Sequence, residues 1–131
     1  MNPGKPYTLE YLKQWHYDLI NSYRDEKING GFTFDGHIYD SDLNARMNIQ
    51  GATTLALAVS SQGQDFPPEF TWRTKDNQNI SHNAASIINM AIAYGAFLST
   101  QYDVSWYDID QGAALNDMQT LLDYDITTGW M

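Results

Sequence analysis

Apolar residues recur at helical spacing near the start of the chain, with charged residues on the opposite side. This pattern predicts a helix from Leu9 to about Lys27, capped by Thr8. Asn29-Gly30-Gly31 would end it, because glycine accepts the left-handed conformation that closes many helices. The predicted apolar stripe consists of Leu9, Leu12, His16, Leu19, Ile20 and Tyr23.

Two short segments alternate between apolar and polar residues, which is the period of a β-strand. One surrounds Asp35-Gly36, a favoured pair for a tight hairpin turn, and the other surrounds Lys75-Asp76-Asn77. On a regular pleat, Phe70, Trp72 and Ile80 would share one face of the second hairpin. The predicted strands are residues 32–34, 37–39, 69–74 and 78–81.

Helical spacing returns after the first hairpin. A second helix is predicted from about Leu43 to Ser61, with Ser41 or Asp42 as its cap and Gly51 inside it. Its apolar positions are Leu43, Met47, Leu55, Ala58 and Val59.

The last third of the chain predicts two more helices. The longer one starts at a cap, Ser81 or Asn83, and runs to about Gln111, with Gly112 as its stop. A short final helix surrounds Leu121. The apolar surface of the longer helix consists of Ala84, Ile87, Ile88, Ala91, Ile92, Gly95, Leu98, Tyr102 and Trp106.

The order helix, hairpin, helix, hairpin, helix, helix predicts a mainly helical α+β fold, with the two short β-hairpins packed beside the helices. Residues 1–7 are predicted to form an N-terminal arm, and residues 8–131 a single globular domain. No glycine-rich phosphate loop joins a strand to a helix, which argues against a nucleotide-binding α/β fold.

Charge narrows the classes of partner. The 131 residues carry a net charge of −9, and all seven Lys and Arg lie at or before Lys75. Such a chain repels phosphate backbones and anionic lipids, so we expect no nucleic-acid partner and no membrane. The acidic last third is either a solvated surface, the commoner case, or a face for a basic protein.

The sequence offers few candidate residues for metal binding or catalysis. Asp40-Ser41-Asp42 resembles the start of a calcium loop, but that loop needs glycine at Ala45 and glutamate at Gly51. With no cysteine and no paired histidine motif, we predict no metal site, and His16 is expected to be packed and hydrogen-bonded. No serine lies in a Gly-x-Ser-x-Gly elbow. We therefore predict no catalytic residue, no cofactor and no enzyme activity.

The segment from Ile28 to Asp42, INGGFTFDGHIYDSD, resembles the signature of a phage domain family of unknown function. That family occurs in tail-fibre, tail-fibre-assembly and related virion proteins of tailed bacteriophages. The resemblance covers about residues 9–130. It continues through residues 46–52, 71–77, 91–96 and 128–130.

The resemblance implies no enzymatic activity and transfers no catalytic residues. The chain departs from the family at residues 102–108, which are more acidic and aromatic than the alanine-rich, basic helix usual there. We therefore expect a surface for a specific partner in this region. The predicted partner surface consists of Tyr102, Asp103, Trp106, Tyr107, Asp108 and Asp110.

The resemblance indicates a structural or accessory component of a phage tail, in a tail fibre, baseplate or fibre attachment. Its expected partners are other tail proteins, with a homo-oligomer as a further option in a symmetric tail. It would be made in the host cytoplasm and reside in the virion tail. The alternative is a tail-fibre assembly chaperone in the host cytosol. A less favoured third reading, an enzyme acting on surface polysaccharide, needs a carboxylate pair in a cleft.

Overall fold

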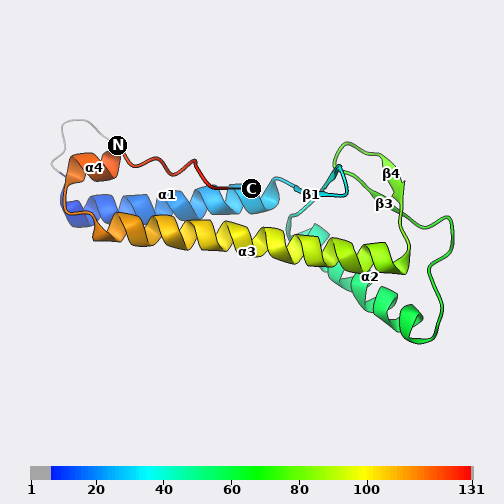
Figure 1. Ribbon diagram of the computed structural model, residues 1–131. Coiled ribbons are helices and arrows are strands. Elements are labelled where there is room, and N and C mark those ends of the chain that lie inside the picture. The colour runs from blue at the N-terminus through cyan, green and yellow to red at the C-terminus, as the bar shows by residue number, and fades with distance from the viewer. Residues whose placement is uncertain (1–6, 131) are drawn as a thin grey trace. The chain divides into compact units, whose positions relative to one another are not determined.

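The computed structural model describes residues 7–130, so the predicted arm of residues 1–7 lies almost wholly outside the described part. Within that part, four helices and two antiparallel strand pairs confirm the predicted mainly helical α+β class (Figure 1). The elements are α1 (Leu9–Asn29), β1 (Phe32–Phe34), β2 (His37–Tyr39), α2 (Leu43–Ser61), β3 (Thr71–Arg73), β4 (Asn79–Ser81), α3 (Ala84–Ala114) and α4 (Met118–Leu122).

Contacts within the chain group into two compact units. Unit 1 holds the chain up to Glu26 and from Thr100 onward, and unit 2 holds Lys27–Ser99. The long helix α3 contributes its N-terminal half to unit 2 and its C-terminal half to unit 1. Whether the two units fold as the single predicted domain stays a prediction.

The first hairpin of unit 2 forms as predicted. Asp35 and Gly36 both have positive φ, 51° and 78°, as the tightest two-residue turns require. Gly31 has φ at 106° and follows the end of α1. A Cβ added at Gly31 would lie 3.0 Å from Ile38 Cγ2. Phe32 pairs with Tyr39 across the hairpin, and both side chains are buried.

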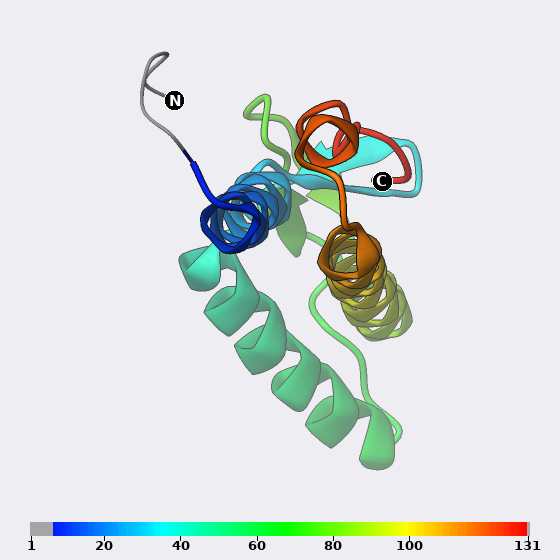
Figure 2. The same cartoon turned by 90° about the vertical axis from the view of Figure 1, so that its left-hand side faces the viewer.

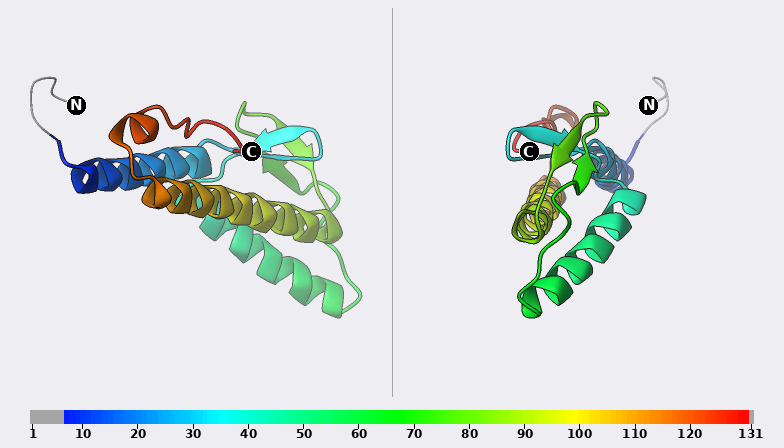
Figure 3. Two further views of the ribbon diagram at one scale, coloured as in Figure 1. Left: turned by 60° about the vertical axis from the view of Figure 1, so that its left-hand side comes forward. Right: turned by 90° about the vertical axis from the view of Figure 1, so that its right-hand side faces the viewer.

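The second hairpin is shorter than predicted, three residues in each strand. Trp72 pairs with Ile80 across the hairpin. Phe70, Trp72 and Ile80 are all half-buried, as expected for residues on one face of the hairpin. The Lys75 backbone N–H donates to the Ile38 carbonyl at 2.8 Å, and Figure 3 shows the two strand pairs side by side. This hydrogen bond links the turn between β3 and β4 to strand β2 of the first hairpin.

Helix α2 covers the predicted range, but the apolar positions read from its sequence are mostly exposed. Asp42 caps it by accepting the Ala45 N–H at 2.9 Å, as predicted. The buried side of α2 carries Ile49 and Ala56 instead. The core of unit 2 consists of Phe32, Tyr39, Ile49, Ala56, Phe66, Ala84, Ile87, Met90, Tyr94 and Phe97.

Helix α3 starts at the predicted cap, because the Ser86 N–H donates to Asn83 Oδ1 at 2.8 Å. Two predictions about it were wrong. The helix runs through Gly112 to Ala114, and its buried face carries Met90 rather than Ile92, which is 65 % exposed. The N-terminal half of α3 is apolar on nearly every side, so spacing alone could not select the face.

Unit 1 is built from α1, the C-terminal half of α3 and α4 (Figure 2). Lys13 Nζ donates to the Ala113 carbonyl at 2.7 Å, and the rings of Tyr23 and Trp130 meet edge to face at 5.3 Å. The first contact joins the end of α3 to α1, and the second joins Trp130 to α1. The buried apolar residues of unit 1 are Leu12, Ile20, Leu121 and Ile126.

Candidate functional site

The predicted partner surface lies on the unit 1 half of α3, and most of it faces solvent. Trp106 and Tyr107 are 56 % and 61 % exposed, and Asp103 and Asp110 are exposed as well. Tyr102 is partly covered, because the Arg24 guanidinium lies 4.9 Å from its ring centroid. Five of the six predicted residues are thus exposed to solvent.

The sixth residue, Asp108, corrects the prediction, because it is only 3 % exposed. It follows Gln101 and Ser105 on the inward face of α3, and both of these are fully buried. Tyr124 donates its hydroxyl to Asp108 Oδ1 at 2.8 Å. Gln101, Ser105 and Asp108 lie four and three residues apart, and this helical spacing was the sequence signal for a buried polar stripe.

Burial sets the electrostatics of this stripe. Desolvation raises the pKa of Asp108, while the Tyr124 hydrogen bond and the nearby His16 act in the opposite direction. Burial lowers the pKa of His16, whose ring meets the Tyr124 ring edge to face at 5.1 Å. His16 is packed as expected, but its Nε2 has no hydrogen-bond partner among the described residues.

A second candidate surface, missed by the sequence reasoning, is the outer face of α2. We define this α2 outer face as Leu43, Met47, Gly51, Leu55 and Ala58, which recur at three- and four-residue spacing opposite the buried Ile49 and Ala56. Leu43, Met47 and Leu55 are 68 %, 60 % and 55 % exposed. Arg46 is the helix's one charged residue, and this near-absence of charge was the available signal.

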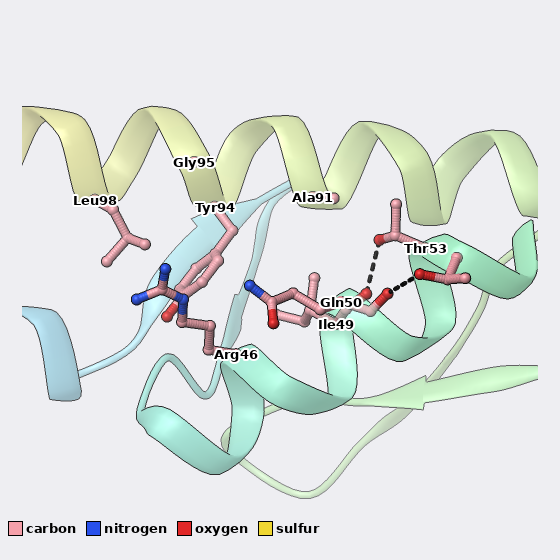
Figure 4. A pocket seen from close by; sticks show the side chains of 9 residues that line it. Arg46, Ile49, Gln50, Thr53, Ala91, Tyr94, Gly95 and Leu98 are labelled. Atoms are coloured by element: carbon pink, nitrogen blue, oxygen red, sulfur yellow. Dashed lines mark hydrogen bonds between the residues drawn. The ribbon is translucent and has the colours of Figure 1, made fainter. Parts of the chain in front are cut away.

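Beside this face, a groove of about 400 Å³ runs between α2 and the N-terminal half of α3 (Figure 4). The groove has free space at Gly95, because a Cβ added there would meet nothing within 4 Å. The lining residues are Arg46, Ile49, Gln50, Thr53, Thr54, Ala91, Tyr94, Gly95 and Leu98.

The groove is mostly apolar in character. The hydroxyls of Thr53 and Thr54 donate to carbonyls of their own helix, at 2.7 and 3.0 Å, and are therefore already satisfied (Figure 4). The Tyr94 hydroxyl donates to the Ser41 carbonyl at 2.9 Å. Among the described residues, no acid pairs with the Arg46 guanidinium. The groove thus offers apolar walls and one unpaired cation.

A serine and a histidine also meet in unit 2. His82 Nδ1 lies 3.0 Å from Ser86 Oγ, and its Nε2 lies 2.9 Å from the Tyr39 hydroxyl. Ser86 Oγ donates to the Asn83 carbonyl and accepts the Asn83 N–H. A neutral ring with its proton on Nδ1 satisfies every group, and burial lowers the pKa of His82 accordingly. The arrangement fixes the start of α3.

No group of three or more His, Asp or Glu side chains within residues 7–130 is placed to hold a metal ion. In the same part of the chain, no helix has both the length and the apolar content that spanning a bilayer requires.

Comparison with known proteins gives one match. The profile of a family described as Domain of unknown function (DUF4376) matches residues 12–128, and the chain therefore belongs to that family. No curated protein and no solved structure matches the chain.

Proposed function

We propose that this member of the DUF4376 family is a protein-binding module that serves as a structural or accessory component of a phage tail. The observation that carries the binding role is the exposed α2 outer face. The tail assignment is supported by the resemblance of residues 28–42 to the phage domain signature. The expected partner is a fibre or baseplate protein.

The energetics of the α2 outer face favour association. Burying a leucine or methionine side chain that is now in water contributes about 1.5–3 kcal/mol. Leu43, Met47 and Leu55 lie along one side of a single helix, so one partner surface can cover all three. Depletion of charge is typical of the centre of a protein interface.

The groove beside this face specifies the partner's chemistry further. A segment that binds there would present apolar side chains to Ile49 and Leu98, and a carboxylate to the unpaired Arg46. Gly51 adds room on the outer face, because a Cβ there would meet nothing within 4 Å. We therefore expect a mainly apolar partner segment with one acidic residue.

The alternative function, a tail-fibre assembly chaperone, is favoured by a different observation. The exposed side of α3 in unit 1 combines Trp106 and Tyr107 with the acids Asp103 and Asp110. Such a surface suits a basic fibre tip.

The enzyme hypothesis needs two reachable carboxylates. In unit 1, burial raises the pKa of Asp108, and hydrogen bonds from Thr127 lower the pKa of Asp125. The hydrogen bond from Tyr124 to Asp108 Oδ1, however, acts to lower the pKa of Asp108 and favours its ionised form, which opposes the use of this carboxyl as a proton donor. We expect the pure protein to leave host polysaccharide unshortened, and measured shortening would contradict this.

Two measurements test the proposal. Mass spectrometry of virions purified from the encoding phage should find the protein at a fixed ratio to the tail proteins. Its absence would exclude a virion component, and fibres that become insoluble without it would then indicate the chaperone.

A matched pair of variants tests the surface. The double change Met47→Glu and Leu55→Glu should reduce incorporation into virions at least about tenfold, because it places charge at an apolar contact. Ile92→Glu adds charge at another exposed apolar position of unit 2, outside the groove, and should leave incorporation unchanged. Equal incorporation of both variants would exclude the α2 outer face as the binding surface.

A further inference from the structure

Unit 1 contains a pocket of about 490 Å³ between the C-terminal half of α3 and the segment after α4. Three aspartates and two tyrosines are among its lining residues, and no lining residue is basic. The lining residues are Asp103, Val104, Tyr107, Asp108, Tyr124, Asp125, Thr128 and Gly129.

Asp108 makes this pocket more than a cluster of surface acids. The residue is 3 % exposed, and its Oδ1 accepts the Tyr124 hydroxyl. Its Oδ2 is buried without a hydrogen-bond partner among the described residues. An unpaired carboxylate oxygen removed from water is costly, and a cationic donor in the pocket would offset that cost.

The other groups of the pocket favour the same kind of ligand. The backbone N–H and hydroxyl of Thr127 donate to Asp125 and lower its pKa, which keeps that carboxylate ionised. Tyr107 is 61 % exposed at the pocket, and the Tyr124 ring forms part of its wall. A flat cation can stack on tyrosine while it donates to carboxylates.

We propose that the unit 1 pocket binds a guanidinium group, presented by an arginine side chain of a partner protein. Asp108 Oδ2 accepts one of its N–H groups, Asp125 supplies the second negative charge, and Tyr107 stacks on its plane. Arginine fits better than lysine because its fork of donors matches separate carboxylate oxygens. This inference is independent of the α2 outer face, which belongs to unit 2.

The test is an NMR titration of the full chain with N-acetyl-arginine amide, which imitates arginine within a peptide. We expect saturable shifts at the backbone amides around Tyr107, Asp108 and Tyr124. The N-acetyl-citrulline amide, equal in shape but neutral, should bind at least about tenfold more weakly. Free arginine, whose own carboxylate the three aspartates repel, should bind more weakly than the amide. The reverse order would indicate a free metabolite and contradict the partner-protein assignment.

Variants complete the test. Asp108→Asn should weaken binding about tenfold or more. Asp18→Asn removes an equal charge from the exposed side of α1 in the same unit and should leave binding unchanged. If Asp108→Asn fails to fold, Tyr107→Ala replaces it, because this exposed side chain contributes little to the fold, and severalfold weaker binding is expected. Absence of saturation, equal binding of citrulline, or equal losses from Asp18→Asn and the pocket variant would overturn the proposal.

Discussion

Gly112 shows how a single residue can serve a purpose other than the one its type suggests. A glycine late in a helical segment predicts a helix end, yet α3 continues to Ala114. An added Cβ at Gly112 would lie 2.2 Å from His16 Nδ1 and 2.3 Å from its Cε1. The glycine is needed because the imidazole of α1 packs directly against the α3 backbone.

We predict that Gly112→Ala lowers the free energy of unfolding by about 1–3 kcal/mol, because the clash with His16 outweighs alanine's better helix propensity. Gly95→Ala is the control, since its Cβ meets open space, and it should raise stability by up to about 1 kcal/mol. Urea unfolding measures both. A stabilising Gly112→Ala would show that His16 moves aside without cost.

The buried histidines give the fold a pH dependence. Burial lowers the pKa of both His16 and His82 below the ordinary 6.5. As the pH falls below 6.5, these histidines therefore become protonated in the unfolded chain while they are still neutral in the folded protein. Their contribution is present above pH 6.5 and is lost as the pH falls below it. Asp108 acts in the opposite direction, because its raised pKa lets the folded protein take up a proton first.

We therefore predict that His82→Gln reduces the loss of unfolding free energy between about pH 7.5 and pH 5.5, relative to the wild type. The comparison isolates His82, because His16 and Asp108 titrate in both proteins. Thermal unfolding at each pH measures the difference. Parallel pH profiles for the two proteins would contradict the prediction.

At the scale of elements, α2 is a helix with two apolar sides. Ile49 and Ala56 are buried in the core of unit 2, whereas Leu43 and Met47 are exposed. Such a helix gains its stability from the buried face and leaves the other face exposed. Its start is fixed locally, by the capping hydrogen bond from the Ala45 N–H to Asp42.

We predict that Asp42→Ala costs about 1 kcal/mol of unfolding free energy, because the Ala45 N–H loses its acceptor. Asp40→Ala removes the same charge two residues earlier, and no hydrogen bond to the Asp40 side chain occurs in the described part of the chain, so it should have little effect. Urea unfolding compares the two variants. Equal losses would mean that charge near the helix start matters, rather than the cap.

At the scale of the whole molecule, α3 joins the two units through one unbroken helix. The boundary between the units falls between Ser99 and Thr100, well inside that helix. Loss of the helical turns on one side removes hydrogen bonds from the turns on the other side. Because of this coupling, we keep the prediction that both units unfold together as the single domain expected from the sequence.

We predict that Phe97→Ala, in the core of unit 2, lowers the unfolding midpoint of both units together, at a cost of about 3–5 kcal/mol. Trp15, Trp106 and Trp130 belong to unit 1, so tryptophan fluorescence reports mainly on that unit, while far-UV circular dichroism reports on both. Coincident transitions are expected. An unchanged fluorescence midpoint beside a shifted circular dichroism signal would mean that the units unfold separately.

The sequence by itself determined the elements, because their signals are local. The Asp35-Gly36 turn, the Asp42 and Asn83 caps and the bounds of α2 follow from backbone preferences and hydrogen bonds within a few residues. It also placed aromatic and acidic residues together on α3, of which Trp106 and Tyr107 are exposed.

Only the tertiary structure decided which face of each helix is buried. Helix α2 and the first half of α3 are apolar on several sides, so their spacing fits more than one orientation, and packing against the hairpins selected one. Asp108 was wrongly predicted to lie on the exposed partner surface, because a charged side chain is expected to face solvent. Its hydrogen-bond partner in the interior, Tyr124, lies 16 residues further along the chain.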